Sequence, residues 1–85
     1  MTSPEITMYG ADWCIDCRRA KGVLDANEIA YTYVDVDAVV EGANAALAIS
    51  GRTNIPVIVF PDGTHQVEPT NADLEAKLRE VGALA

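Results

Sequence analysis

Trp13-Cys14-Ile15-Asp16-Cys17 contains both cysteines of this 85-residue chain. A short apolar run at residues 6–9 precedes this stretch, and a segment with helical spacing follows it. Two cysteines separated by two residues, at the junction between a strand and a helix, are typical of a redox dithiol. The sequence therefore predicts a fold organised around this junction.

The length and charge of the chain narrow the class of protein. Residues 1–85 are enough for one domain and too few for two. Six basic residues against thirteen acidic ones give a formal net charge of −7. This balance argues against nucleic acid or an anionic membrane surface as a partner, because both need a basic footprint. No window approaches the ~18 uninterrupted apolar residues of a membrane helix.

The N-terminus and the cysteine content point to a cellular location. Residues 1–5 carry neither the basic nor the apolar region of a secretory signal, so we expect a cytoplasmic protein. A stable structural disulfide is unusual in that compartment, which leaves catalysis or metal binding for the two cysteines. A structural zinc site normally has four ligands, and the chain has no second cysteine pair and a single histidine, His65. We therefore expect no metal site.

The spacing of apolar residues predicts seven elements. Strands are expected at residues 6–9, 31–36, 57–60 and 65–67, and helices at about 14–27, at 38–49 and after residue 70. The first strand-helix-strand unit implies two parallel strands joined by a right-handed crossover. A tight turn at residues 61–64 makes the last two strands an antiparallel hairpin.

Sequence patterns predict the caps and the buried faces of the second and third helices. Asp37 is expected to cap the second helix. Its buried stripe is expected to consist of Val40, Ala43 and Leu47. Thr70 and Asp73 resemble a capping box for the last helix. That helix is expected to bury Leu74, Leu78 and Val81.

The two cysteines are expected to play different roles. Only a thiolate attacks a disulfide, and the unpaired amides and dipole at the start of a helix favour an anion at Cys14. Cys17 lies about one turn further on the same face, shielded and placed to attack a mixed disulfide. Asp16 opposes the thiolate, and Arg18 and Arg19 on the next turn offset this, so we expect Asp16 and Arg18 to tune its reactivity.

The element order, the Trp13-Cys14-x-x-Cys17 motif and the Ile55-Pro56 step resemble the glutaredoxin branch of the thioredoxin superfamily. The resemblance covers nearly the whole chain. It implies an α/β, thioredoxin-like fold with a four-stranded mixed sheet in the order 2-1-3-4 and three helices. It also implies a cis Ile55-Pro56 peptide, with Ile55 offering its backbone to the substrate. Trp13 would be either a partly exposed lid over the substrate or a ring packed against Pro56 or the first helix.

The segment before the last helix narrows the resemblance. Residues 69–73, Pro-Thr-Asn-Ala-Asp, with Lys-Leu at residues 77–78, resemble actinobacterial mycoredoxins. Members of that family reduce mixed disulfides with mycothiol, a cysteinyl pseudo-disaccharide. Thr70 and Asn71 would then bind the sugar, unless they only cap the helix. Glutathione-using glutaredoxins commonly have a Gly-Gly pair here, which this chain lacks, and Glu68 would repel a carboxylate.

This resemblance implies a thiol-disulfide oxidoreductase with no bound cofactor and with mycothiol or glutathione as co-substrate. Its partners would be disulfide-containing or S-thiolated proteins, with a thiol-disulfide reductase as a further candidate, and it would act as a monomer. Two alternatives remain open. One is a thioredoxin-reductase-linked redoxin that donates electrons to ribonucleotide reductase, although the Ser-Gly-Phe-Arg-Pro segment typical of that group is absent. The other is a module that binds an iron–sulfur cluster in a dimer through Cys14 and an external thiol.

Overall fold

The computed structural model describes residues 5–84, so the expectation about a missing signal falls largely outside the described residues, on residues 1–4. Seven elements follow one another: β1 (Thr7–Gly10), α1 (Ile15–Ala26), β2 (Thr32–Asp35), α2 (Val40–Ser50), β3 (Val57–Val59), β4 (His65–Val67) and α3 (Asn71–Glu80). None of the helices in this range is long and apolar enough to cross a membrane.

The four strands form one mixed sheet in the order β2-β1-β3-β4. β1 runs parallel to β2 and antiparallel to β3, and β3 pairs antiparallel with β4. This arrangement confirms the predicted order 2-1-3-4, the parallel first pair and the closing hairpin. β1 is therefore a central strand. From the C-terminal end of β1 the chain passes into α1, and both cysteines lie at this junction.

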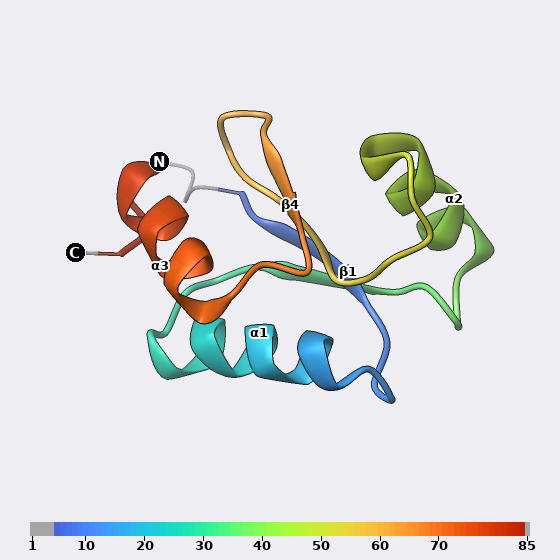
Figure 1. The fold of residues 1–85 in the computed structure, drawn as a ribbon, viewed down its shortest axis with the longest axis horizontal. Coiled ribbons are helices and arrows are strands. Elements are labelled where there is room, and N and C mark those ends of the chain that lie inside the picture. The colour runs from blue at the N-terminus through green and yellow to red at the C-terminus, as the bar shows by residue number, and fades with distance from the viewer. Residues whose placement is uncertain (1–4, 85) are drawn as a thin grey trace.

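The helices form two unequal layers on the sheet. α1 and α3 lie side by side on one face, and α2 stands apart from them beyond the sheet (Figure 1). The main hydrophobic core lies between the sheet and the α1–α3 layer. Its buried members are Ile6, Met8, Cys14, Cys17, Ala20, Leu24, Ile58, Phe60, Leu74 and Leu78. Both cysteines thus belong to the packed core.

Local sequence signals account for the ends of α1 and α3. Cys17, Ala20 and Leu24 recur at helical spacing and are buried. α1 ends at Asn27, whose Nδ2 donates to the carbonyl oxygen of Val23 at 2.8 Å. α3 begins after Thr70. The hydroxyl of Thr70 accepts a hydrogen bond from the backbone N–H of Asp73 at 3.1 Å, which confirms the predicted cap.

The predicted start of α2 is wrong. The helix begins at Val40, and its N-cap is Val39, whose side chain makes no capping hydrogen bond. Asp37 does not cap this helix. The carboxylate of Asp35 instead accepts the N–H groups of Asp37 and Ala38 at 2.9 and 3.2 Å, which forms a turn before the helix starts.

The predicted buried stripe of α2 is also wrong in part. Gly42 and Ala46 are buried, whereas Val40 and Leu47 are 71% and 45% exposed. A Cβ at position 42 would lie 2.5 Å from Cγ1 of Val34 in β2. The helix backbone therefore packs directly against the sheet at Gly42, and this close approach turns the larger side chains toward solvent.

Candidate active site

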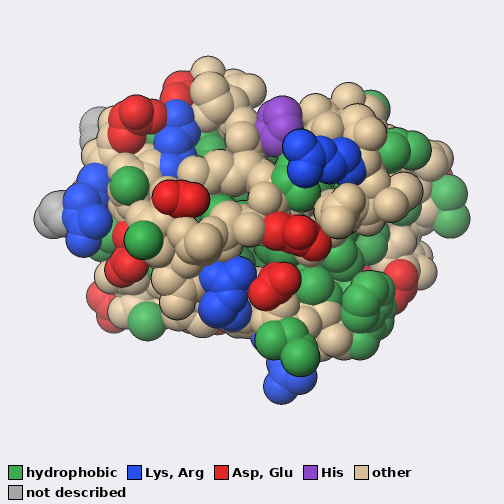
Figure 2. Space-filling view, in the orientation of Figure 1, with side chains coloured by type: hydrophobic (Ala, Val, Ile, Leu, Met, Phe, Trp, Pro, Cys, Tyr) green, Lys and Arg blue, Asp and Glu red, His purple; other side chains and the backbone are tan. Residues whose placement is uncertain are grey.

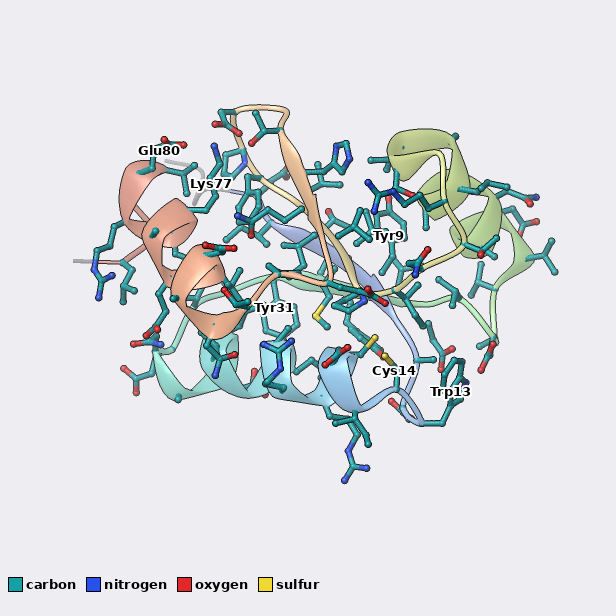
Figure 3. All side chains as sticks on the ribbon, viewed as in Figure 1. Tyr9, Trp13, Cys14, Tyr31, Lys77 and Glu80 are labelled. Carbon is teal, nitrogen blue, oxygen red and sulfur yellow. The ribbon has the colours of Figure 1, made fainter. Side chains whose placement is uncertain are left out.

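The junction between β1 and α1 holds the dithiol. After β1, the carbonyl oxygen of Ala11 accepts the N–H of Cys14 at 3.1 Å, and Cys14 becomes the N-cap of α1. Its Sγ accepts the N–H of Cys17 at 3.3 Å. Figure 3 shows the Cys14 side chain beside the N-terminal end of α1. The N–H of Cys17 and the positive end of the helix dipole thus point toward this sulfur.

The second sulfur has different surroundings. Cys17 has no exposed surface, whereas Cys14 keeps 8% of its own. Burial raises the pKa of Cys17 well above its ordinary value, and the hydrogen bond and charge of Cys14 add to the effect. Cys14 is therefore the sulfur that a substrate can reach, and Cys17 is a shielded neutral thiol one turn behind it.

Gly10 allows the dithiol to pack against the sheet. A Cβ at this position would lie 2.9 Å from Sγ of Cys17 and 3.3 Å from Cε1 of Tyr33. Only glycine permits this approach of the strand to the buried sulfur. No sequence pattern indicates this role of Gly10, because the close approach is a tertiary contact.

Tyr33 supports the dithiol from β2. Its hydroxyl is buried and has no hydrogen-bond partner among the described residues. Burial raises the pKa of Tyr33 to about 12, so the hydroxyl stays neutral at physiological pH. Lys21 on α1 places its Nζ 4.2 Å from the ring centroid, within the range of a cation–π contact. These contacts give Tyr33 a structural role beside the dithiol.

The Ile55-Pro56 step lies directly opposite Cys14. The peptide bond is cis, as the resemblance implied. The thiol of Cys14 donates to the carbonyl oxygen of Ile55 over 3.7 Å. On the other side, the backbone N–H of Glu68 donates to the carbonyl oxygen of Pro56 at 2.9 Å. The sulfur of Cys14 therefore faces the main chain of Ile55 across a narrow gap.

A groove of about 370 Å³ opens over this gap. Its lining residues are Trp13, Cys14, Ile15, Asp16, Thr53, Asn54, Ile55 and Glu68. Thr70 and Asn71, which were expected to bind substrate, are not among them. Thr70 caps α3, and Oδ1 of Asn71 accepts a hydrogen bond from Nη1 of Arg19 at 2.6 Å. The polar neutral side chains of the groove are instead Thr53 and Asn54.

Asp16 is paired with Arg19 rather than with Arg18. Nη2 of Arg19 lies 3.3 Å from the Asp16 carboxylate, and it also donates to the carbonyl oxygen of Pro69 at 3.0 Å. Arg18 is exposed. The three-residue spacing between Asp16 and Arg19 on one helix was the signal in the sequence, because residues three apart are neighbours on a helix surface.

Trp13 stands at the outer end of the groove. It is 68% exposed, so the alternative of a ring packed against Pro56 or α1 is wrong. Its indole Nε1 donates to the carboxylate of Asp37 in the turn between β2 and α2. The labelled side chain in Figure 3 lies away from the core, on the loop that leads into α1. No local pattern indicates this contact, because the two residues are 24 positions apart.

The described part of the chain contains no group of three or more His, Cys, Asp or Glu side chains arranged to hold a metal ion. A mononuclear metal centre built from residues 5–84 alone therefore has no ligand set.

Comparisons with known proteins agree with this arrangement. The Glutaredoxin family model matches residues 6–66. A protein of Mycobacterium tuberculosis with a provisional glutaredoxin name is 32% identical over 82 residues, which are 95% of this chain and 98% of that protein. Mycoredoxin 1 of Corynebacterium glutamicum is 34% identical over 74 residues, which are 86% of this chain and 91% of that protein.

A solved structure supports the fold independently. The glutaredoxin of Archaeoglobus fulgidus superposes with a TM-score of 0.78 at 23% identity, covering 87% of this chain and 85% of that one. At this identity the likeness concerns the fold alone. The predicted resemblance in sequence and in architecture is thereby confirmed.

Proposed function

Because the chain belongs to the glutaredoxin family of thiol-disulfide oxidoreductases, we propose that it reduces mixed disulfides of proteins with a low-molecular-weight thiol, through Cys14 and Cys17. The observation that carries the proposal is the inequality of the two sulfurs. Cys14 is at the helix N-terminus and opens to the groove, whereas Cys17 is buried and one turn away.

The proposed reaction has two exchange steps. The Cys14 thiolate attacks one sulfur of the substrate disulfide, which forms a mixed disulfide with Cys14 and releases the other sulfur as a thiolate. Cys17 then loses its proton to solvent and attacks the Cys14 sulfur, which releases the bound thiol and leaves a Cys14–Cys17 disulfide. Alternatively, a free low-molecular-weight thiol performs this second attack and restores Cys14 directly. Two electrons pass to the substrate in either route.

We propose that Trp13, Ile55 and Pro56 position the substrate. The main chain of Ile55 faces the sulfur of Cys14, and Pro56 fixes the direction of that main chain. Trp13 forms the outer wall and is held by Asp37. Thr70 and Asn71 lie outside the groove, so we propose Thr53 and Asn54 as the polar groups that contact the bound thiol.

The lining of the groove favours mycothiol over glutathione as the co-substrate. Glutathione carries two carboxylates, whereas a cysteinyl pseudo-disaccharide presents neutral hydroxyl groups. No basic side chain lines the groove, and two acidic ones do. The similarity to mycoredoxin 1 of Corynebacterium glutamicum points in the same direction. S-thiolated proteins are the proposed partners, and the cytoplasm, with its reducing thiol pool, is the proposed location.

A coupled assay tests the proposal. A protein mixed disulfide is offered to the full chain with mycothiol, glutathione or thioredoxin reductase as the electron donor. Mycothiol should support the fastest turnover, and Cys14→Ser should abolish it. Turnover by Cys17→Ser would assign a monothiol route, whereas its loss would assign the dithiol route.

Two results would contradict the proposal. Activity that survives Cys14→Ser would show that the nucleophile is wrong. Turnover with thioredoxin reductase alone would show that the protein is a reductase-linked redoxin and that mycothiol is not its co-substrate. Purification without oxygen adds a check, because a brown dimer would indicate an iron–sulfur module instead.

A further inference from the structure

The groove beside Cys14 has a one-sided charge. Of its eight lining residues, Asp16 and Glu68 are acidic and none is basic. The two carboxylates come from different elements, Asp16 from the first turn of α1 and Glu68 from the segment after β4. Figure 2 shows acidic side chains next to hydrophobic ones over the start of α1. A substrate that enters the groove therefore meets negative charge within a few residues of its cysteine.

The charges of the two carboxylates are compensated to different degrees. Asp16 shares an ion pair with Arg19, which also binds Asn71 and Pro69 and is thus held in place. Glu68 makes no ion pair among residues 5–84. Its only side-chain hydrogen bond there is at 3.5 Å from Nδ2 of Asn54, a neutral amide. Glu68 is therefore the uncompensated charge of the groove.

A main-chain hydrogen bond fixes the position of Glu68 relative to the Cys14 sulfur. The N–H of Glu68 is bonded to the carbonyl oxygen of Pro56, and the preceding carbonyl, that of Ile55, faces the Cys14 sulfur. A substrate segment that lies along Ile55 therefore brings the side chains next to its cysteine close to Glu68.

Arg52 directly precedes the groove residues Thr53, Asn54 and Ile55 but does not line the groove itself. It lines an adjoining hollow of about 170 Å³ against α2, which shares these three residues with the groove. Among residues 5–84 Arg52 makes no ion pair with Asp16 or Glu68.

We infer that Glu68 is a specificity residue, and that this protein selects disulfides whose cysteine is flanked by lysine or arginine. The inference rests on the proposed function and names the class of protein segment on which the dithiol acts. One exposed ion pair changes a rate by up to about fivefold. The formal net charge of −7 adds a long-range attraction for cationic partners at low salt.

The test uses three peptides that differ only in the residues on either side of a single cysteine: lysine, glutamine or glutamate. Each cysteine carries 2-thiopyridine in a disulfide, a neutral group. Attack of the Cys14 thiolate on the peptide sulfur forms the Cys14–peptide disulfide and expels the thiopyridine anion, which takes a proton from water. The resulting thiopyridone is followed by its absorbance in a single turnover. Each rate is divided by the rate of 2-mercaptoethanol with the same peptide.

In the wild type the lysine peptide should react about fivefold faster than the glutamate peptide at low salt. This ratio should shrink in about 0.5 M salt, because the charges are solvent-exposed. Glu68→Gln should reduce the ratio to about twofold or less, and Glu68→Lys should invert it. Glu28→Gln is the matched control, since Glu28 follows the far end of α1, a helix of about 18 Å. It should keep the wild-type ratio.

The outcomes separate the inference from the function on which it rests. Equal ratios in the wild type and in Glu68→Gln, with all three peptides reacting, would overturn the selection by Glu68 and leave the oxidoreductase intact. Equal losses in Glu68→Gln and Glu28→Gln would assign the preference to net charge rather than to the groove and would also overturn it. Failure of Cys14 to react with any peptide would overturn the proposed function itself.

Discussion

At the scale of single residues, Cys17 is a neutral thiol because it is enclosed by the core and faces the sulfur of Cys14. A group whose pKa is higher in the folded chain than in the unfolded chain stabilises the fold when the pH is below the pKa of the unfolded chain. This stability is lost as the pH rises toward the pKa of the folded chain, because the unfolded chain releases its proton first. The unfolded value for a cysteine is about 8.5.

We therefore expect the free energy of unfolding of the reduced Cys14→Ser protein to fall as the pH rises above about 8.5, by at most about 1.4 kcal/mol per pH unit. Urea unfolding between about pH 7.5 and 9.5 measures this slope below the range in which tyrosine and lysine titrate. The Cys14→Ser/Cys17→Ser double variant is the control and should lack the slope. The same slope in both proteins would contradict the neutral, buried state of Cys17.

Asp16 sets a second residue-scale expectation. Its carboxylate lies two positions from Cys14 and opposes a negative sulfur, although Arg19 offsets part of the charge. Asp16→Asn removes the carboxylate and frees Arg19, and both changes stabilise negative charge that develops on the sulfur. In a Cys17→Ser background, Cys14 should therefore react about two- to fivefold faster with a neutral disulfide at pH 7. Glu28→Gln removes an equal charge at the far end of α1 and should leave this rate unchanged. An unchanged or lower rate in Asp16→Asn would contradict a tuning role.

At the scale of elements, the contact between β1 and α1 depends on the absence of a side chain at Gly10. Gly10→Ala brings a Cβ to 2.9 Å from the Cys17 sulfur, so the strand or the helix must shift. We expect a loss of about 1–3 kcal/mol in the free energy of unfolding. Gly22→Ala in α1 is the control, because a Cβ at position 22 meets nothing within 4 Å. It should raise stability by up to about 1 kcal/mol. Equal effects of the two changes on urea unfolding would contradict the role of Gly10.

The sequence was a good guide to elements that depend on local patterns. Alternating and helical spacing found every strand and helix within a few residues, and Thr70 was recognised as a cap because capping joins residues three apart. α2 was misjudged at its start and on its buried face. Its orientation follows from the contact of Gly42 with Val34, and nothing in the local pattern encodes such a tertiary approach.

The same distinction applies to the site. The spacing of Cys14 and Cys17 was readable, because one helical turn joins them. The contact of Trp13 with Asp37 and the place of Glu68 beside Pro56 join segments far apart in the chain. Thr70 and Asn71 were expected either to bind the sugar of mycothiol or only to cap the helix, and the structure shows the Thr70 cap and a contact of Asn71 with Arg19.

At the scale of the whole molecule, the two faces of the sheet are unequally covered. The α1–α3 face holds the large buried side chains, among them Phe60, Met8 and Leu24. The α2 face is covered at Gly42 and Ala46, with Val40 and Leu47 turned outward. Local opening requires less free energy where fewer apolar contacts are broken. We therefore expect backbone amides in α2 to exchange with deuterium at least about tenfold faster than those in the centre of α1.

The N-cap of α2, Val39, makes no side-chain capping hydrogen bond, and a substitution there tests this expectation. Val39→Ser supplies a hydroxyl to accept an unpaired N–H of the first turn and should stabilise the helix by about 1 kcal/mol, which slows exchange in α2 by about fivefold. Val40→Ser, one residue further and already inside the helix, is the control and should give no such slowing. Protection of α2 equal to that of α1 in the wild type would contradict the unequal layers. If the layers are unequal, α2 opens without disturbing α1, because the dithiol is packed in the opposite layer.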